Sequence, residues 1–220
     1  MVRAVIFDMD GVLIDGREWH YRSLNRALQL FGYRIGRQEH LASFDGVPTR
    51  VKLEKLSCER GLPRRLHGFI NELKQAYAIE LVHQHCRPTF AHQYALSRLR
   101  ELGYQLAVAS NSIRKTVDLM LDRAGLMPYL DFTLSNEDVT RPKPHPEIYQ
   151  MAIARLGLSP SECLIVEDNQ NGIAAARASG AHVMTVRNPD DVYFEAIARQ
   201  IAQTNERSSP ANLQRLGRAA

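Results

Sequence analysis

Residues 2–15 have the sequence VRAVIFDMDGVLID, in which a short apolar run ends at two aspartates. The run at residues 2–7 is rich in β-branched side chains and predicts a buried parallel strand. Asp8 and Asp10 follow it directly. Side chains alternate along an extended chain, so both carboxylates are expected on one side, at the strand end where open α/β sheets bind ligands. A turn closed at Gly11 is the alternative at this point, because Asp-x-Asp-Gly is also common turn chemistry.

The same pattern of a strand followed by a helix recurs along the chain. Apolar runs that predict strands lie at residues 105–109, 163–166 and 182–186, with a weaker candidate at 129–134. Helical patterns occupy residues 91–102, 114–124, 146–156 and 172–179. Glycines follow these helices where left-handed caps are expected, namely Gly103, Gly125, Gly157 and Gly180. This alternation predicts an α/β fold with a doubly wound parallel sheet.

Residues 16–88 break the alternation. Helical patterns at residues 18–31, 49–60 and 66–82 follow one another with no strand between them. We therefore expect a core domain formed by residues 1–15 and 89–204, with residues 16–88 inserted as a small α-helical cap domain. Residues 205–220 are expected to form a flexible basic tail.

Composition excludes several classes of protein. The chain has 220 residues, of which 45% are hydrophobic and 24% charged, an ordinary globular balance that excludes a disordered or collagen-like chain. No apolar run approaches the roughly 18 to 20 residues of a membrane helix. The chain starts directly in its first predicted strand, so we expect a cytoplasmic protein without membrane contact. Its three cysteines lack the spacing of a zinc site.

The net charge of +4 comes from particular regions of the chain. Residues 16–90 carry 13 basic and 7 acidic side chains, and residues 199–220 carry four arginines and one glutamate. The remaining chain has 11 basic and 16 acidic side chains and is therefore acidic. A nucleic-acid-binding module is the alternative that this charge raises, but the chain lacks a recognised motif or an interleaved aromatic platform. We expect no nucleic-acid partner, and instead an anionic small molecule drawn to a basic cap.

Three further segments carry polar side chains where strands end or helices begin. Ser110, Asn111 and Ser112 precede a helix and would suit an anion, although a serine acting as the helix N-cap is equally compatible with the pattern. Lys143 lies between Pro142 and Pro144, which restrict its backbone; we favour a functional lysine over a loop that merely starts a helix.

A second acidic pair ends the fourth predicted strand. Glu167 and Asp168 stand at its carboxyl end, as Asp8 and Asp10 do at the end of the first. Carboxylates gathered in one place repel one another and raise one another's pKa. Hard oxygen ligands from two strand ends are typical of a magnesium site, which would relieve that repulsion.

These segments together resemble the four motifs of the haloacid dehalogenase-like (HAD) superfamily, in order and at the strand ends. They are Asp8-Met9-Asp10-Gly11-Val12, Ser110-Asn111, Lys143-Pro144 and Glu167-Asp168. The resemblance covers about residues 2–187 and implies a Rossmann-like core. A helical insert after the first motif is typical of subclass I, and Asp15 with His20 resembles the branch of β-phosphoglucomutase and small-molecule phosphatases.

The resemblance implies a role for each motif residue. Asp8 would be the nucleophile that forms an aspartyl-phosphate, and Asp10 the general acid and base. An aspartate at that second position is typical of phosphoryl-transfer members rather than dehalogenases. Ser110, Asn111 and Lys143 would hold the phosphoryl oxygens.

Magnesium is the cofactor that the resemblance implies. Its ligands would be Asp8, the backbone carbonyl of Asp10, and Asp168. Glu167 would either be a further ligand or contact one.

In the cap, the resemblance assigns substrate-binding residues. His20 would couple to the aspartate acid and base, the alternative being a surface histidine. Gly46 and Val47 resemble the cap loop that contacts the far end of the substrate. Arg50 would bind a second anionic group there, and a solvated arginine is equally compatible with its position.

We therefore predict a magnesium-dependent phosphatase that acts on a small phosphorylated metabolite, a sugar phosphate being the preferred class. A β-phosphoglucomutase-like sugar-phosphate mutase is the alternative. Asp45 and Gly16 depart from the mutase pattern, whereas His20 retains it. A monomer or weak homodimer is expected.

Overall fold

The computed structural model describes residues 1–207 and contains a parallel sheet at their centre. Its five strands have the order β3-β2-β1-β4-β5. The strands are β1 (Ala4–Phe7), β2 (Gln105–Ala109), β3 (Phe132–Leu134), β4 (Cys163–Glu167) and β5 (His182–Thr185). This sheet confirms the predicted α/β class, and the weakest strand candidate, at residues 129–134, contains β3.

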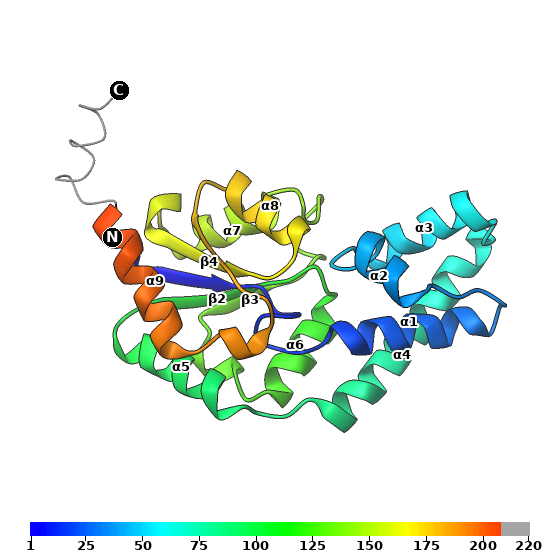
Figure 1. Cartoon of the computed structure of the whole chain (residues 1–220), viewed down its shortest axis with the longest axis horizontal. Helices are drawn as coiled ribbons and strands as arrows, with labels where there is room; N and C mark the ends of the chain where they lie inside the picture. Colours follow the sequence, from blue (N-terminus) through cyan, green and yellow to red (C-terminus); the bar gives the residue numbers. More distant parts are fainter. Residues whose placement is uncertain (208–220) are drawn as a thin grey trace.

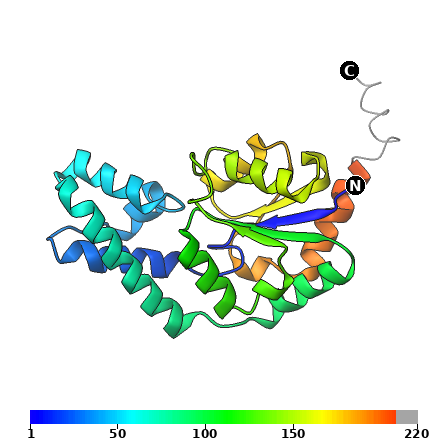
Figure 2. The ribbon, with the colours of Figure 1, turned by 180° about the vertical axis from the view of Figure 1, so that it is seen from behind.

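Helices cover both faces of the sheet (Figures 1 and 2). The core helices are α5 (Phe90–Glu101), α6 (Arg114–Arg123), α7 (Glu147–Leu156), α8 (Gln170–Ala178) and α9 (Phe194–Arg207). Val5 and Phe7 of β1 belong to the apolar cluster on the side of α5, α6 and α9. Ala4 and Ile6 belong to the cluster on the side of α7 and α8. Because all four β1 side chains are buried, this strand has no polar face, as expected of a central parallel strand.

The strand register aligns the ends of the three central strands. Phe7 pairs with Val108 of β2 and with Val166 of β4. The residues that follow β1, β2 and β4 therefore meet at one edge of the sheet. The chain adds β2 and β3 on one side of β1 and β4 and β5 on the other, which is the topology in which such an edge opens into a crevice.

Residues 17–85 form helices that lie beside the sheet's carboxyl edge (Figure 1). They are α1 (Arg17–Gln29), α2 (Arg37–Ser43), α3 (Thr49–Arg60), the short 3₁₀ helix η1 (Arg64–Leu66) and α4 (His67–His85). This cap has an apolar core of its own, which includes Leu24, Phe44, Leu56 and Ile70. The boundaries at residues 15/16 and 88/89 remain our proposed division.

Two helices were not predicted. The seven residues of α2 are mostly polar and bury only His40, so they give no amphipathic signal. The other is α9, which extends through residues 205–207 and so corrects the predicted start of the tail. The rest of that predicted tail, residues 208–220, lies outside the described residues. Among residues 1–207, no helix has both the length and the apolar character needed to cross a bilayer.

Candidate active site

A cavity of about 340 Å³ lies between the sheet edge and the cap. Nearly all of the predicted site residues line it: Asp8, Asp10, His20, Gly46, Val47, Arg50, Ser110, Asn111, Lys143 and Asp168. Glu167 is the exception, because it is completely buried behind the cavity wall. The fold thus brings together residues that lie as far as 160 positions apart in the sequence.

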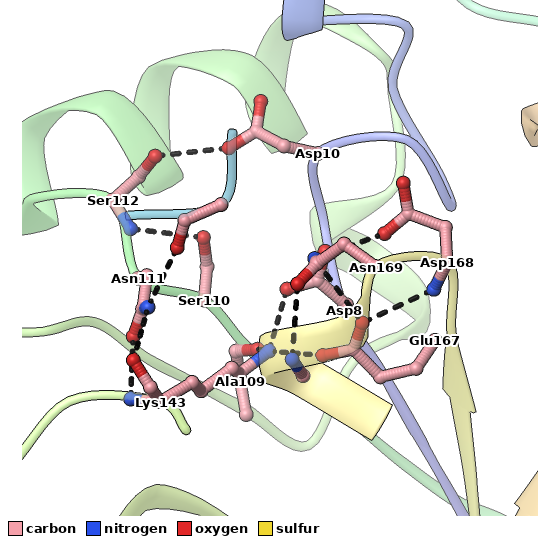
Figure 3. A network of polar contacts seen from close by, with 12 residues as sticks. Asp8, Asp10, Ala109, Ser110, Asn111, Ser112, Lys143, Glu167, Asp168 and Asn169 are labelled. Carbon is pink, nitrogen blue, oxygen red and sulfur yellow. Dashed lines mark hydrogen bonds and ion pairs between the residues drawn. The ribbon is translucent and has the colours of Figure 1, made fainter. Parts of the chain in front are cut away.

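Lys143 is the centre of a buried polar network (Figure 3). Its Nζ lies 2.6 Å from Asp8 Oδ1 and 2.7 Å from Glu167 Oε1. It also donates to the backbone oxygen of Ala109 at 2.8 Å and to the Tyr149 hydroxyl at 2.7 Å. Burial lowers the pKa of Lys143, but the charges of Asp8 and Glu167 outweigh it and leave the pKa raised. The lysine is therefore a fixed cation beside Asp8.

Glu167 holds the base of this network in place. Its Oε1 accepts hydrogen bonds from Lys143 and from the Tyr149 hydroxyl, the latter at 2.5 Å. Its Oε2 accepts from the backbone N–H of Asp168 at 3.1 Å. Gly172 at the start of α8 leaves room for this carboxylate, because a Cβ there would overlap with it.

The acidic residues at the strand ends form a cluster suited to a divalent cation. Asp8, Glu167 and Asp168 each offer a carboxylate oxygen, and the three oxygens lie within 4.8 Å of one another. Burial raises the pKa of Asp8 well above its usual range, against the opposing charge of Lys143, and the charges of Glu167 and Asp168 raise it further. Burial and the charge of Glu167 raise the pKa of Asp168 to about 6.

One buried oxygen in this cluster has no hydrogen bond. Asp168 Oδ2 is enclosed, and the nearest cation is Arg17, with Nη1 at 3.5 Å. A buried oxygen without a hydrogen bond, beside two further carboxylates, fits the hard oxygen donor set of Mg²⁺. The Asp10 carboxylate lies outside this cluster. Of the groups of Asp10, only the backbone carbonyl therefore remains as a metal ligand, and this carbonyl is the ligand that the sequence led us to expect.

Asp10 is held by one residue from the cap and one from the core. His20 on α1 places Nε2 3.0 Å from Asp10 Oδ1. The Ser112 hydroxyl donates to Asp10 Oδ2 at 2.9 Å (Figure 3). Burial raises the pKa of Asp10, but the charge of His20 and these two hydrogen bonds lower it more. Lys74 Nζ lies 3.3 Å from the other ring nitrogen of His20. His20 is thus not a surface histidine.

The segment after β2 differs in part from expectation. Ser110 Oγ accepts from the backbone N–H of Ser112 at 3.1 Å. Neither serine is the N-cap of α6, because that position is Ile113 and no side chain caps the helix. The N-cap interpretation was therefore wrong.

Asn111 connects two loops of the site. Its Nδ2 donates to the backbone oxygens of Gly46, at 3.0 Å, and Lys143, at 3.2 Å. Its Oδ1 accepts from the backbone N–H of Lys143 at 3.1 Å. Gly46 has a φ of +66°, and a Cβ there would lie 2.8 Å from Asn169 Oδ1, so glycine lets the cap loop approach the core closely.

Sequence reasoning missed four residues of this site: Ser112 as a donor to Asp10, Tyr149, Lys52 and Lys74. Tyr149 lies on the apolar face of α7, and the sequence pattern of that helix indicates a side chain that packs in the core. Lys52 and Lys74 lie on helices, where a lysine usually indicates a solvated face. Only Ser112 carried a usable signal, since it follows Ser110 and Asn111 at the same strand end.

Comparison with known sequences decides the family. The sequence profile of haloacid dehalogenase-like hydrolases matches residues 5–186. The chain belongs to this family. This membership confirms the predicted haloacid dehalogenase-like superfamily.

Named relatives of this HAD hydrolase include two enzymes of phosphate chemistry. Pyrophosphatase PpaX of Bacillus velezensis is 30% identical over 188 residues, which cover 81% of this chain and 80% of that protein. The phosphorylated carbohydrates phosphatase of Thermotoga maritima is 29% identical over 182 residues, covering 81% and 82%. These names support the predicted phosphoric monoester hydrolase.

The HAD fold is also shared with a solved structure. β-Phosphoglucomutase of Clostridium difficile superimposes with a TM-score of 0.80 and covers 92% of this chain and 98% of its own. The two sequences are 20% identical, a level at which the similarity shows the fold alone.

Proposed function

We propose that this HAD hydrolase is a magnesium-dependent phosphatase that acts on a small phosphorylated metabolite, with sugar phosphates as the preferred class. The observation that carries the proposal is the pair of strand-end aspartates in one cavity. Asp8 lies beside Lys143 and the acidic cluster, whereas Asp10 is held apart by His20 and Ser112. The two carboxylates thus have different surroundings and suit different roles.

Asp8 is the nucleophile in the proposed mechanism. One of its carboxylate oxygens attacks phosphorus, the bond from phosphorus to the leaving oxygen breaks, and an aspartyl-phosphate forms. Lys143 keeps its charge in this buried position and stabilises Asp8 as a carboxylate. Its hydrogen bonds to Ala109 and Tyr149 fix where that charge lies.

Asp10 moves the protons in both steps. It gives a proton to the leaving oxygen in the first step. In the second step it takes a proton from a water whose oxygen attacks phosphorus, while the bond from phosphorus to the Asp8 oxygen breaks and inorganic phosphate leaves. The lowered pKa of the substrate-free state suits the second role. In the first step, the charge of the bound phosphoryl group raises the pKa of a neighbouring carboxyl group and so favours the protonated form.

The remaining strand-end residues bind the phosphoryl oxygens and the cation. Ser110 and Lys143 lie along the cavity wall next to Asp8 and supply hydroxyl and ammonium donors. The side-chain amide of Asn111 donates to the backbone oxygens of Gly46 and Lys143 instead, so Asn111 holds the lysine loop in place beside the phosphoryl group. Asp8, Asp168 and the Asp10 carbonyl would hold Mg²⁺, with Glu167 in contact with them. When bound, the cation supplies positive charge that reduces the repulsion between the Asp8 carboxylate and the phosphate.

The cap encloses the substrate. The cavity wall opposite the strand ends is formed by cap residues, namely His20, Gly46, Val47 and Arg50, so closing the cap over a bound substrate excludes bulk water.

A panel of phosphorylated metabolites tests the proposed phosphatase function. With Mg²⁺ we expect inorganic phosphate to be released from at least one class, and EDTA to stop the release. Absence of release from every class would contradict the proposal.

A sugar-phosphate mutase is the second candidate, favoured by the hydrogen bond between His20 and Asp10. It would use the same aspartates but return the phosphoryl group to the sugar. Conversion of β-glucose 1-phosphate into glucose 6-phosphate without release of phosphate would favour the mutase.

A further inference from the structure

Arg17 lies between the cap and the acidic cluster. It is the first residue of α1, and its Nη1 lies 3.5 Å from Asp168 Oδ2. Its Nη2 donates to the backbone oxygen of Arg187, shortly after β5, at 2.9 Å. The Arg17 side chain is 32% exposed, whereas that of Asp168 is completely buried. One guanidinium group therefore contacts a buried carboxylate of the cluster and a loop of the core at the same time.

Helix α1 itself gives no reason for an arginine at this position. The N-terminus of a helix carries positive partial charge, so a cation is disfavoured there. Gly11, in the loop after β1, leaves the space in which Arg17 and Asp168 meet. A Cβ at Gly11 would overlap with Asp168 Oδ2 and lie 3.0 Å from Arg17 Nε. The contact with Asp168 therefore accounts for the basic residue at the start of α1.

The charges of the cluster show what Arg17 compensates. Asp8, Glu167 and Asp168 carry three negative charges when ionised, and Lys143 contacts only the first two. Among the described residues, Arg17 is the one cation within ion-pair distance of Asp168. Burial and the charge of Glu167 raise the pKa of Asp168 to about 6, and the charge of Arg17 acts in the opposite direction. A buried carboxylate without a partner is costly, so Arg17 stabilises the metal-free cluster.

A divalent cation held by Asp8 and Asp168 would change this balance. Together with Lys143 it supplies three positive charges, which equal the three negative charges of the cluster. Arg17 then adds a further positive charge beside Asp168, and like charges repel in a partly buried site. An arginine keeps its charge at physiological pH, so deprotonation does not relieve this repulsion.

We propose that Arg17 competes with Mg²⁺ for Asp168 and so sets the affinity of the site for the metal. In the metal-free protein the guanidinium group supplies part of the charge that the cation supplies when bound. Binding of Mg²⁺ displaces Arg17 from Asp168, while its hydrogen bond to the Arg187 oxygen remains. The inference rests on the magnesium site of the proposed function and adds a residue that opposes the metal.

Calorimetric titration of the substrate-free protein with Mg²⁺ tests this competition. Arg17→Met removes the charge and keeps an unbranched side chain. We expect it to lower the Kd for Mg²⁺ about 10-fold, within the usual range of coupling between two sites. Damage to the site would raise the Kd instead, so the direction of the change separates competition from a merely structural role. An unchanged or higher Kd would overturn the inference.

Arg22→Met is the matched control, since Arg22 lies on the same helix, is exposed and does not line the cavity. It removes the same charge from the protein and should leave the Kd for Mg²⁺ unchanged. A decrease as large as that of Arg17→Met would mean that net charge alone sets the affinity, which contradicts the inference. Arg17→Gln also lacks the charge and should give the same decrease, so it replaces Arg17→Met if that variant does not fold.

Thermal unfolding provides a second readout. In EDTA we expect Arg17→Met to have a lower Tm than the wild type, because Asp168 loses its cation. The same concentration of Mg²⁺ should raise the Tm of the variant more than that of the wild type, since a tighter ligand stabilises the folded state more. In an Asp168→Asn background, Arg17→Met should no longer lower the Tm in EDTA. An equal loss in both backgrounds would mean that Arg17 acts through the Arg187 oxygen, which contradicts the inference.

The outcomes separate this inference from the proposed function. Binding of Mg²⁺ with the same Kd by wild type and Arg17→Met would reject the competition and leave the phosphatase proposal intact. Absence of Mg²⁺ binding in both would reject the magnesium site and the inference together. A lower Kd in Arg17→Met would support the competition even if no phosphorylated metabolite were hydrolysed, an outcome that would reject only the phosphatase.

Discussion

The side-chain amide of Asn111 donates to the backbone oxygen of Gly46 at 3.0 Å and so connects the core to the cap. The same side chain pairs with both backbone polar groups of Lys143. One residue at the end of β2 therefore holds the lysine loop of the core and the closing loop of the cap. Cap position and the placement of Lys143 are coupled through it.

Replacing Asn111 with alanine should loosen the cap loop. The change removes three hydrogen bonds of about 1 kcal/mol each, so kcat/KM for p-nitrophenyl phosphate should fall at least about 10-fold. Amide hydrogen exchange in residues 44–48 should become faster. Asn188→Ala, which removes a helix N-cap hydrogen bond of the core at a residue that does not line the cavity, should leave exchange in this loop unchanged. Unaltered exchange in the Asn111 variant would show that the loop is held by other contacts.

Gly172→Ala tests the close packing of α8 against Glu167. The added Cβ would overlap with the Glu167 carboxylate, so the carboxylate or the helix must shift. We expect the free energy of unfolding to fall by about 1–3 kcal/mol and phosphatase activity to fall with it. Gly68→Ala is the control, because a Cβ at Gly68 in α4 would meet nothing within 4 Å. That change should be neutral or stabilise by up to about 1 kcal/mol in urea denaturation. Equal stabilities of the two variants would contradict the packing argument.

Lys143→Met should be costly for both activity and stability. It leaves the carboxylates of Asp8 and Glu167 buried without their cation, which typically destabilises a protein by about 3–5 kcal/mol. Lys115→Met, at an exposed position of α6, should change stability by less than about 0.5 kcal/mol. Chemical denaturation of both variants measures the difference. A Lys143 variant as stable as the control would mean that the buried network contributes little.

His40 should make stability dependent on pH. Its folded pKa of about 4 lies below the unfolded value of about 6.5, because the buried ring resists protonation. The contribution is therefore fully present above about pH 6.5 and is lost as the pH falls through about 4. Across that window the wild type should lose about 3 kcal/mol relative to His40→Leu protein. His83→Leu, at an exposed position, should show no such difference from the wild type. Parallel pH profiles for wild type and His40→Leu would refute the assignment.

Strand ends were predictable from sequence because their signal is local. The apolar run before Asp8 and the similar run before Glu167 identify buried parallel strands, and parallel strands bring their ends together. β3 was only a weak candidate, since just three of its residues pair with β2.

The cap residues that face the cavity were not predictable in the same way. Lys52 and Lys74 lie on helices α3 and α4, whose sequences give no strong amphipathic pattern, and their burial depends on how the cap packs over the core. The role of Tyr149 also depends on distance in space, because Glu167 lies 18 residues away on another element. Helix α2 was missed because its burial is limited to His40.

The mechanism's central claim is that Asp8 carries the phosphoryl group and Asp10 is needed to remove it. Asp10→Asn protein mixed with p-nitrophenyl phosphate and Mg²⁺ tests this directly, because nitrophenolate leaves without a proton whereas the attacking water still needs a base. Intact mass spectrometry should show a mass increase of one phosphoryl group. Peptide mapping should place that group on Asp8, and Asp8→Asn/Asp10→Asn protein should not gain it. Phosphate on another residue, or sustained turnover by Asp10→Asn protein without a phosphorylated intermediate, would contradict the mechanism.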